Sequence, residues 1–175
     1  MNGAARNLVF KASGTVGAQG GERAMVLLAF EANAGSAGQG YPAVLRVADA
    51  QGRNANTRGR VFGLGEDRSI TFSSVIERDG DGAPVFADLV RASWDRAGNR
   101  LIGTFLPPVA ASQVSALYRR LRDETEAHTT ATRAEIESIT ATYGQSVDLP
   151  VKVVASGLRA ARLAEPGAMP GPRLG

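Results

Sequence analysis

Short apolar or alternating runs, separated by turn residues, fill the chain from Arg6 to Leu106. This spacing is typical of an antiparallel meander, so we predict seven strands. They span residues 7–16, 23–33, 42–48, 58–64, 68–77, 85–94 and 100–106. A meander of this kind forms either a sandwich or a closed barrel, and the pattern leaves both open.

The fifth run alternates, which predicts a strand with one wet side. One face carries Ile70, Phe72, Ser74 and Ile76, and the other carries Thr71, Ser73 and Glu77. The second and seventh runs are apolar on both faces, from Ala24 to Phe30 and from Leu101 to Leu106. We therefore expect those two strands to be covered on each side, by an opposing sheet within and by a helix or a partner outside, with the long helix as the first candidate.

Residues 109–143 contain no glycine or proline, whereas 16 of the 21 glycines precede Leu106. At 100° per residue a single stripe persists along this segment. It includes Val114, Leu117, Tyr118, Leu121, Thr125, His128, Thr132, Ile136, Ile139 and Tyr143. The shared phase favours one amphipathic helix from Ser112, its N-cap, to Tyr143, roughly 48 Å long.

A helical hairpin is the alternative, because Thr132 and Glu135 have the spacing of a capping box after Thr129 and Thr130. Beyond Gly144, residues 147–155 predict a returning strand, placed at a sheet edge because Pro150 cannot donate a ladder hydrogen bond.

The predicted fold is mainly β with α, divided into four parts along the chain. Residues 1–106 form an antiparallel β domain of seven or eight strands with the returning strand, and residues 107–146 form the long amphipathic helix or hairpin. Residues 147–163 supply the returning strand and a short basic segment. Residues 164–175 form an extended Pro/Gly-rich tail.

Composition supports one folded core, with 43% hydrophobic and 21% charged residues in 175. The net charge is +3, and acids are interleaved with bases, so nucleic acid is not the expected partner. There is no cysteine and no apolar run long enough to span a membrane. We expect a soluble chain in the cytoplasm or a virion, or in the periplasm or at the cell surface if a leader was removed.

No motif predicts a catalytic, cofactor-binding or metal site. His128 is the only histidine, and the helical neighbours on its stripe offer no carboxylate to orient it, so a partly buried polar spacer is expected there. The segment Arg78–Gly82 lacks the ligand spacing of a calcium loop and predicts a hairpin turn. The segment Gly63–Asp67 lacks the third glycine of a dinucleotide fingerprint and predicts a turn.

Charged and aromatic residues on the strands give weaker indications. Glu31, Asp88 and Arg91 lie on or near apolar strands, where a charged group pointing into a barrel would bind or polarise a ligand, but solvent-facing positions are favoured. Trp94 and Tyr41 are candidates for a cavity mouth and are more commonly core or rim residues.

Two functions follow from the pattern. The first is a non-catalytic assembly or interaction protein whose helix and C-terminal tail contact a partner protein or another copy. In it, Val114, Leu117, Tyr118 and Leu121 pack on the protein's own sheet, Ile136, Ile139 and Tyr143 meet another subunit, and His128 lies at the polar crossing between them. The alternative is a lipocalin-like barrel that binds a small apolar ligand or acts as an isomerase or cyclase.

Overall fold

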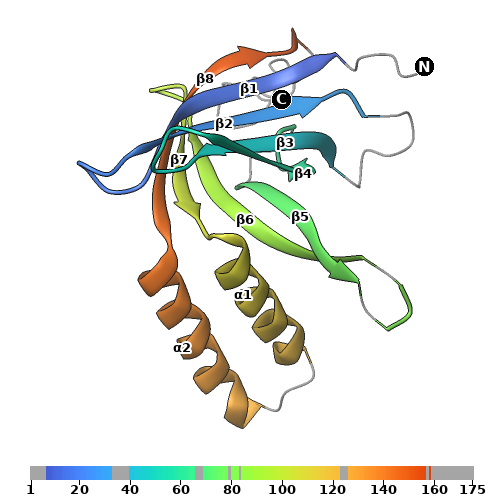
Figure 1. Ribbon diagram of the computed structural model, residues 1–175. Coiled ribbons are helices and arrows are strands. Elements are labelled where there is room, and N and C mark those ends of the chain that lie inside the picture. The colour runs from blue at the N-terminus through green and yellow to red at the C-terminus, as the bar shows by residue number, and fades with distance from the viewer. Residues whose placement is uncertain are drawn as a thin grey trace, which may run out of the picture.

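Eight antiparallel strands form a closed barrel in which each strand pairs with its neighbours in sequence (Figure 1). The computed structural model describes residues 7–32, 40–65, 69–78, 80–82, 84–122, 126–156 and 158. The strands are β1 (Leu8–Val16), β2 (Arg23–Phe30), β3 (Tyr41–Ala48), β4 (Asn54–Phe62), β5 (Ile70–Arg78), β6 (Pro84–Asp95), β7 (Arg100–Phe105) and β8 (Gln145–Val154). The meander predicted from the alternating runs is confirmed, and its form is a barrel.

The returning strand β8 closes the barrel because it pairs with both β1 and β7. It therefore has no free edge, and the edge position inferred from Pro150 is wrong. Pro150 lies opposite Arg100 of β7, and the next residue, Val151, donates its backbone N–H to the Asn99 carbonyl at 2.8 Å. The ladder continues past the proline through this neighbouring bond.

Large side chains fill the barrel interior, as expected for an eight-stranded barrel of this size. The bulkiest fully buried ones are Phe10, Phe72, Met25, Leu27, Leu45, Leu64, Ile70, Leu89, Leu101, Leu149, Val16 and Val61. The Phe10 and Trp94 rings meet edge to face with their centroids 5.3 Å apart. These contacts form a packed core inside the barrel.

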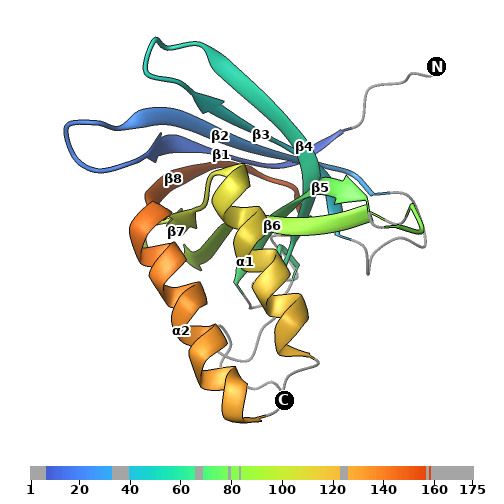
Figure 2. The same ribbon diagram turned by 60° about the horizontal axis from the view of Figure 1, so that its bottom comes forward.

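Two helices, α1 (Pro108–Leu121) and α2 (Glu126–Tyr143), lie between β7 and β8 in the sequence and pack against each other. The single helix is therefore wrong and the hairpin is confirmed. Folding back lets the α2 stripe, with Thr132 and Ile136 buried, pack on α1 instead of extending into solvent. Figures 1 and 2 show the hairpin projecting from one end of the barrel.

The ends of the two helices differ from those expected. α1 begins at Pro108 with Pro107 as its N-cap, not at Ser112, because proline has the backbone angle of a first helical turn. The break in the hairpin lies before Glu126 rather than at Thr129 to Thr132. Thr132 is buried in the middle of α2, so its capping-box spacing with Glu135 does not start a helix.

α1 lies beside β6, where that strand continues past the end of β7 (Figure 2). Pairing between β6 and β7 runs from Asp95 to Val90, which leaves the first part of β6 without a β7 neighbour. There the Ser115 hydroxyl donates to the Phe86 carbonyl at 2.8 Å. The helix thus protects an unpaired strand edge.

The helices do not cover β2 and β7 as expected. Ile102 of β7 stays 45% exposed, and the outward residues of β2, such as Val26 and Leu28, are half-buried by their neighbours in the sheet. The hairpin packs through α1 on β6 instead. The apolar pattern of these two strands therefore predicted correctly that one face is buried in the barrel. It did not predict which element lies over the other face.

Two strand details also differ from the prediction. β4 begins at Asn54 rather than at Arg58, because the polar residues Asn54 to Thr57 pair with Ala48 to Leu45 of β3. On β5, Ile70 and Phe72 face the core as expected, but Ser73 is buried too and is bonded to Asp88.

Candidate functional site

A cleft of about 310 Å³ lies between α1 and the outer surface of β6 and β7. Its apolar lining includes Phe86, Leu89, Leu106, Val114 and Tyr118, and its polar lining includes Asp88, Arg91, Thr104, Ser115 and Thr140. Its volume lies at the lower end of the range found for small-molecule sites. We call it the β6–α1 cleft.

A β-bulge places the two charged residues of this cleft on one side of β6. Phe72 pairs with Val90 and Ser73 pairs with Asp88, so Leu89 is the extra residue. In a regular strand, positions three apart point to opposite faces, and the bulge cancels this alternation. As a result Asp88 and Arg91 both line the cleft.

A chain of polar contacts runs from β5 through Asp88 to α1. The Ser73 hydroxyl donates to Asp88 Oδ1, and Arg91 Nη2 donates to Asp88 Oδ2 at 2.7 Å. The Arg91 guanidinium in turn lies over the Tyr118 ring, 5.4 Å from its centre. Since both carboxylate oxygens and the guanidinium already have partners, this arrangement suits binding and positioning rather than proton transfer.

The structure places the charged residues singled out on the strands in different surroundings. Asp88 and Arg91 point away from the barrel interior, in line with the outward position favoured for them, and they lie beneath α1. Glu31 lies on the surface and accepts a hydrogen bond from Asn7 Nδ2 at 3.1 Å. Tyr41 and Trp94 are both half-buried against the core, and the Trp94 ring packs edge to face on Phe10.

A second cleft, of about 480 Å³, lies on the other side of the α1 N-terminus. It is lined by Thr57, Ser74, Val75, Leu89, Pro108, Val109, Ser112 and Gln113. We call it the fork cleft, because β4 and β5 pair only through Arg60–Phe62 and Thr71–Ser73 and separate beyond that point. Leu89 lines both clefts.

Exposed apolar side chains gather around these clefts. Eight large hydrophobic residues are exposed in the described part of the chain, and four of them line one cleft or the other. These are Val75 (43% exposed), Phe86 (42%), Val109 (74%) and Tyr118 (38%). Val75 and Phe86 are also cross-strand partners. We call these four residues the α1 surface.

The stripe residues predicted to contact a partner have different degrees of burial. Val114, Leu117 and Ile136 are buried within the chain, and Leu121 and Ile139 pack partly buried against the core. Tyr118, His128 and Tyr143 are exposed. His128 is thus more exposed than a spacer within an interface, and Tyr118 alone of the stripe belongs to the α1 surface.

A third groove, of about 510 Å³, lies between the helices on the side away from the β6–α1 cleft. Its lining includes Leu117, Arg120, Ile139 and Tyr143. The predicted tail contacts, residues 164–175, lie outside the described residues, as does most of the basic segment 158–163.

Sequence reasoning missed Val75, Phe86 and Val109. Val75 and Phe86 sit on outward positions of predicted strands, where an isolated apolar residue is common. Val75 and Phe86 belong to a site because they pair with each other and because α1 packs on β6, whereas the sequence predicted a helix over β2 and β7.

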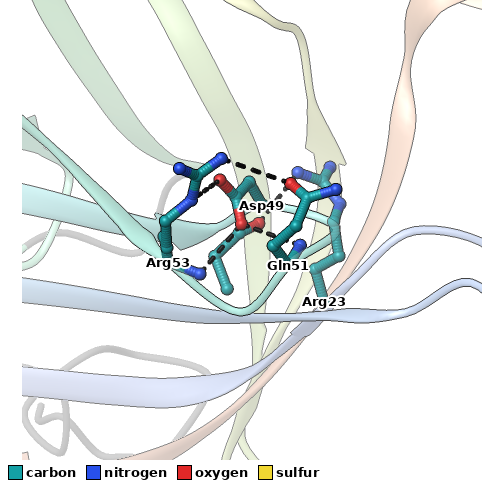
Figure 3. A network of polar contacts seen from close by, with 5 residues as sticks. Arg23, Asp49, Gln51 and Arg53 are labelled. Carbon is teal, nitrogen blue, oxygen red and sulfur yellow. Dashed lines mark hydrogen bonds and ion pairs between the residues drawn. The ribbon is translucent and has the colours of Figure 1, made fainter.

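A polar network closes the β3–β4 turn (Figure 3). Asp49 Oδ1 accepts hydrogen bonds from the backbone N–H groups of Gln51 and Arg53, at 2.9 and 2.8 Å, and Oδ2 accepts one from Arg53 Nε at 3.1 Å. These bonds, first of all that from the Arg53 backbone, lower the pKa of Asp49 below its ordinary value of 3.8. Gly52 has a φ of 81°, which glycine adopts without strain.

Arg23 fixes this end of the barrel to neighbouring strands. Its Nη1 donates to the Ala48 carbonyl at 3.0 Å, and its Nη2 donates to Gln145 Oε1. One side chain therefore connects β2, β3 and β8, next to the turn that Asp49 organises.

Within the described residues, no cluster of His, Asp or Glu side chains has the arrangement of a metal site. No helix of the described residues is both long and apolar enough to cross a membrane. Comparison with known proteins finds no matching family model, no matching curated protein and no matching solved structure.

Proposed function

We propose that this protein is a non-catalytic interaction protein and that the α1 surface binds an apolar element of another protein chain. The observation that carries the proposal is the gathering of Val75, Phe86, Val109 and Tyr118 around the two clefts beside α1. Contiguous apolar surface of this kind marks interaction sites in folded proteins.

The surroundings of the α1 surface support the same conclusion. Two of the apolar side chains belong to α1 and two to the neighbouring strands β5 and β6, while Asp88 and Arg91 add a paired charge at one side. An apolar centre bordered by polar groups is the usual composition of a binding surface. Aromatic residues such as Phe86 and Tyr118 are also the side chains that most often dominate binding energy at interfaces.

The proposal is tested with three variants, each carrying one charged substitution. Phe86→Glu and Val109→Glu alter the α1 surface, and Ile102→Glu is the control, since Ile102 is an equally exposed apolar residue on β7. Binding of a hydrophobic dye is measured by fluorescence, and self-association by sedimentation over a wide concentration range.

We expect Phe86→Glu and Val109→Glu to reduce dye binding and any association between copies, while Ile102→Glu behaves like the wild type. Equal dye binding by all four proteins would overturn the proposal, because the α1 surface would then be no more adhesive than an isolated exposed residue. Sedimentation tells whether a second copy is itself a partner.

Small-ligand binding is the second candidate function, and the β6–α1 cleft is the observation that favours it. This cleft combines apolar walls with the Asp88–Arg91 pair and three hydroxyl groups, those of Thr104, Ser115 and Thr140. The barrel interior, by contrast, is occupied by the large side chains of the core. A ligand site would therefore lie outside the barrel, unlike the interior site of the lipocalin-like hypothesis.

A thermal-shift screen with small apolar and aromatic acids tests this second candidate. Binding to the native state raises the midpoint of unfolding with ligand concentration. A ligand of the β6–α1 cleft should lose its effect in Val114→Trp, which fills the cleft, and retain it in Val109→Trp, which alters only the fork cleft. Stabilisation that survives Val114→Trp would place the ligand elsewhere.

A further inference from the structure

The first part of β4, Asn54–Arg58, has no strand partner among the described residues along one of its edges. Asn54–Arg58 pair with β3 on one side, whereas β5 pairs with β4 only at Arg60–Phe62. Figure 2 shows the β3–β4 hairpin and the β5–β6 hairpin diverging from this point. An unpaired strand edge presents a row of main-chain donors and acceptors.

The hydrogen-bond pattern shows which main-chain groups lie on the free edge. Asp49 N donates to Arg53 O at 2.7 Å, so the odd-numbered residues of β4 bond to β3. The even-numbered residues then point toward β5, and the Ser74 hydroxyl donates to the Arg58 carbonyl from that side at 2.8 Å. Asn54 and Asn56 therefore direct both their N–H and their C=O groups to the free edge.

The β3–β4 hairpin also carries the net charge of the chain. Residues 41–62 contain Arg46, Arg53, Arg58 and Arg60 and one acid, Asp49, for a net charge of +3. The whole chain also has +3, so the remaining 16 bases and 16 acids balance. Asp49 is bonded to Arg53, while Arg58 is exposed and forms no ion pair with any described residue.

We propose that the free edge of β4 binds an extended acidic segment of a partner protein as an added strand. Such a strand would form hydrogen bonds with Asn54 and Asn56, and its acidic side chains would lie near Arg58 and Arg46 on the outer face. This inference goes beyond the proposed function, since it depends on main-chain groups of β4 and shares with the α1 surface only Val75 and Val109 of the fork cleft.

The side chains of the added strand would alternate in character. Thr57 lies between Asn56 and Arg58, points to the opposite face and lines the fork cleft. Every second residue of the partner strand would therefore face this cleft, whose lining includes Val75, Leu89 and Val109. The recognised segment alternates acidic residues with apolar ones of moderate size.

A second copy of this chain does not suit the same edge. Pairing β4 with β4 of another copy would bring two hairpins of +3 together. Like charges across a strand pair are destabilising, so the arginines oppose self-pairing while favouring an acidic partner. The hydrogen bonds that close the turn at Asp49 favour the extended form of β4 before any partner binds.

The test uses a fluorescein-labelled peptide of sequence TEVEVET and the full chain, with fluorescence anisotropy as the readout. The decisive variant is Asn56→Pro, which removes an N–H group on the free edge without removing a bond to β3. Asn56→Ala is the matched control, because it keeps that N–H and removes only the side-chain contact with Arg46.

We expect the wild type and Asn56→Ala to bind alike and Asn56→Pro to bind about tenfold more weakly. Arg58→Gln should weaken binding and reduce its dependence on salt. The lysine peptide TKVKVKT should not bind. Phe86→Glu should leave binding unchanged, because Phe86 lines the β6–α1 cleft and not the fork cleft that the added strand would face.

Three results would overturn the inference. One is the absence of TEVEVET binding to the wild type, and another is equal binding by Asn56→Pro and Asn56→Ala. The third is displacement of TEVEVET by single-stranded oligothymidylate to the same extent in the wild type and in Asn56→Pro, since charge alone would then explain binding. Circular dichroism checks the fold of each variant, and Asn54→Pro repeats the test at the neighbouring edge position if Asn56→Pro is unfolded.

Discussion

The Arg91 guanidinium lies 5.4 Å from the centre of the Tyr118 ring, and this contact connects β6 with α1. The same guanidinium is held from the other side by Asp88 at 2.7 Å. Arg91 of β6 thus orients Tyr118 of α1 through its guanidinium, which lies on the same outer side of β6 as Asp88 because of the β-bulge. The position of α1 over the barrel depends on this contact as well as on apolar packing.

A double-mutant cycle on Arg91 and Tyr118 measures the strength of this contact. We expect Arg91→Gln and Tyr118→Leu to be coupled by about 0.5–1 kcal/mol, because the guanidinium is partly exposed. Urea unfolding of the wild type, both single variants and the double variant gives the coupling energy. Strict additivity would mean that the ring and the cation do not interact in solution.

Ile136→Ala tests whether α2 packs back on the molecule. Ile136 is 7% exposed, so we expect its truncation to leave a cavity and cost about 2–4 kcal/mol in the free energy of unfolding. Tyr143→Ala, at the last residue of α2 with its side chain 53% exposed, is the control and should have a much smaller effect. Similar urea midpoints for both variants would favour an undocked helix.

The charge on Asp49 should stabilise the fold in a defined range of pH. Its pKa is lowered in the folded state, so its stabilising effect is complete above the ordinary value of 3.8 and is lost as pH falls through the lower folded-state value. Asp49→Asn keeps an acceptor for the turn and removes the charge. We expect the difference in urea midpoint between wild type and Asp49→Asn to be largest near neutral pH and to shrink as pH falls below 3.8. A pH-independent difference would contradict this account.

Gly59→Ala should destabilise the junction at which β4 and β5 separate. A Cβ atom at Gly59 would lie 2.1 Å from the Ser73 carbonyl oxygen and 2.8 Å from the Phe72 ring, so one of the strands must shift. We expect a loss of about 1–3 kcal/mol, measured by thermal or urea unfolding. Gly21→Ala is the matched control because its new methyl group has nothing closer than 3.8 Å. Equal stability of the two variants would show that the junction is looser than described.

The strands were predictable from the sequence because each carries its own local pattern. Seven predicted strands match β1 to β7 within a few residues, except at the start of β4. That start depends on pairing with β3, and no local feature of Asn54 to Thr57 records it. Strand pairing is a non-local property, and here it overrides the low strand propensity of asparagine.

The helical hairpin shows the limit of the same reasoning. One continuous stripe is compatible with a single helix and with two helices whose apolar faces meet, since both keep the same positions buried. The choice depends on whether Thr132 and Ile136 find cover on α1, which is a question of tertiary packing. The α1 surface was likewise beyond prediction, because the β-bulge at Leu89 and the placement of α1 together create it.

The contact between Phe10 and Trp94 gives this molecule an internal optical reporter. Trp94 is the only tryptophan, and it lies against the barrel core while the helical hairpin contains none. Its emission should therefore follow opening of the barrel and remain insensitive to separation of the helices. Far-UV ellipticity includes the helical signal, so comparing the two during unfolding tells whether the hairpin and the barrel unfold together.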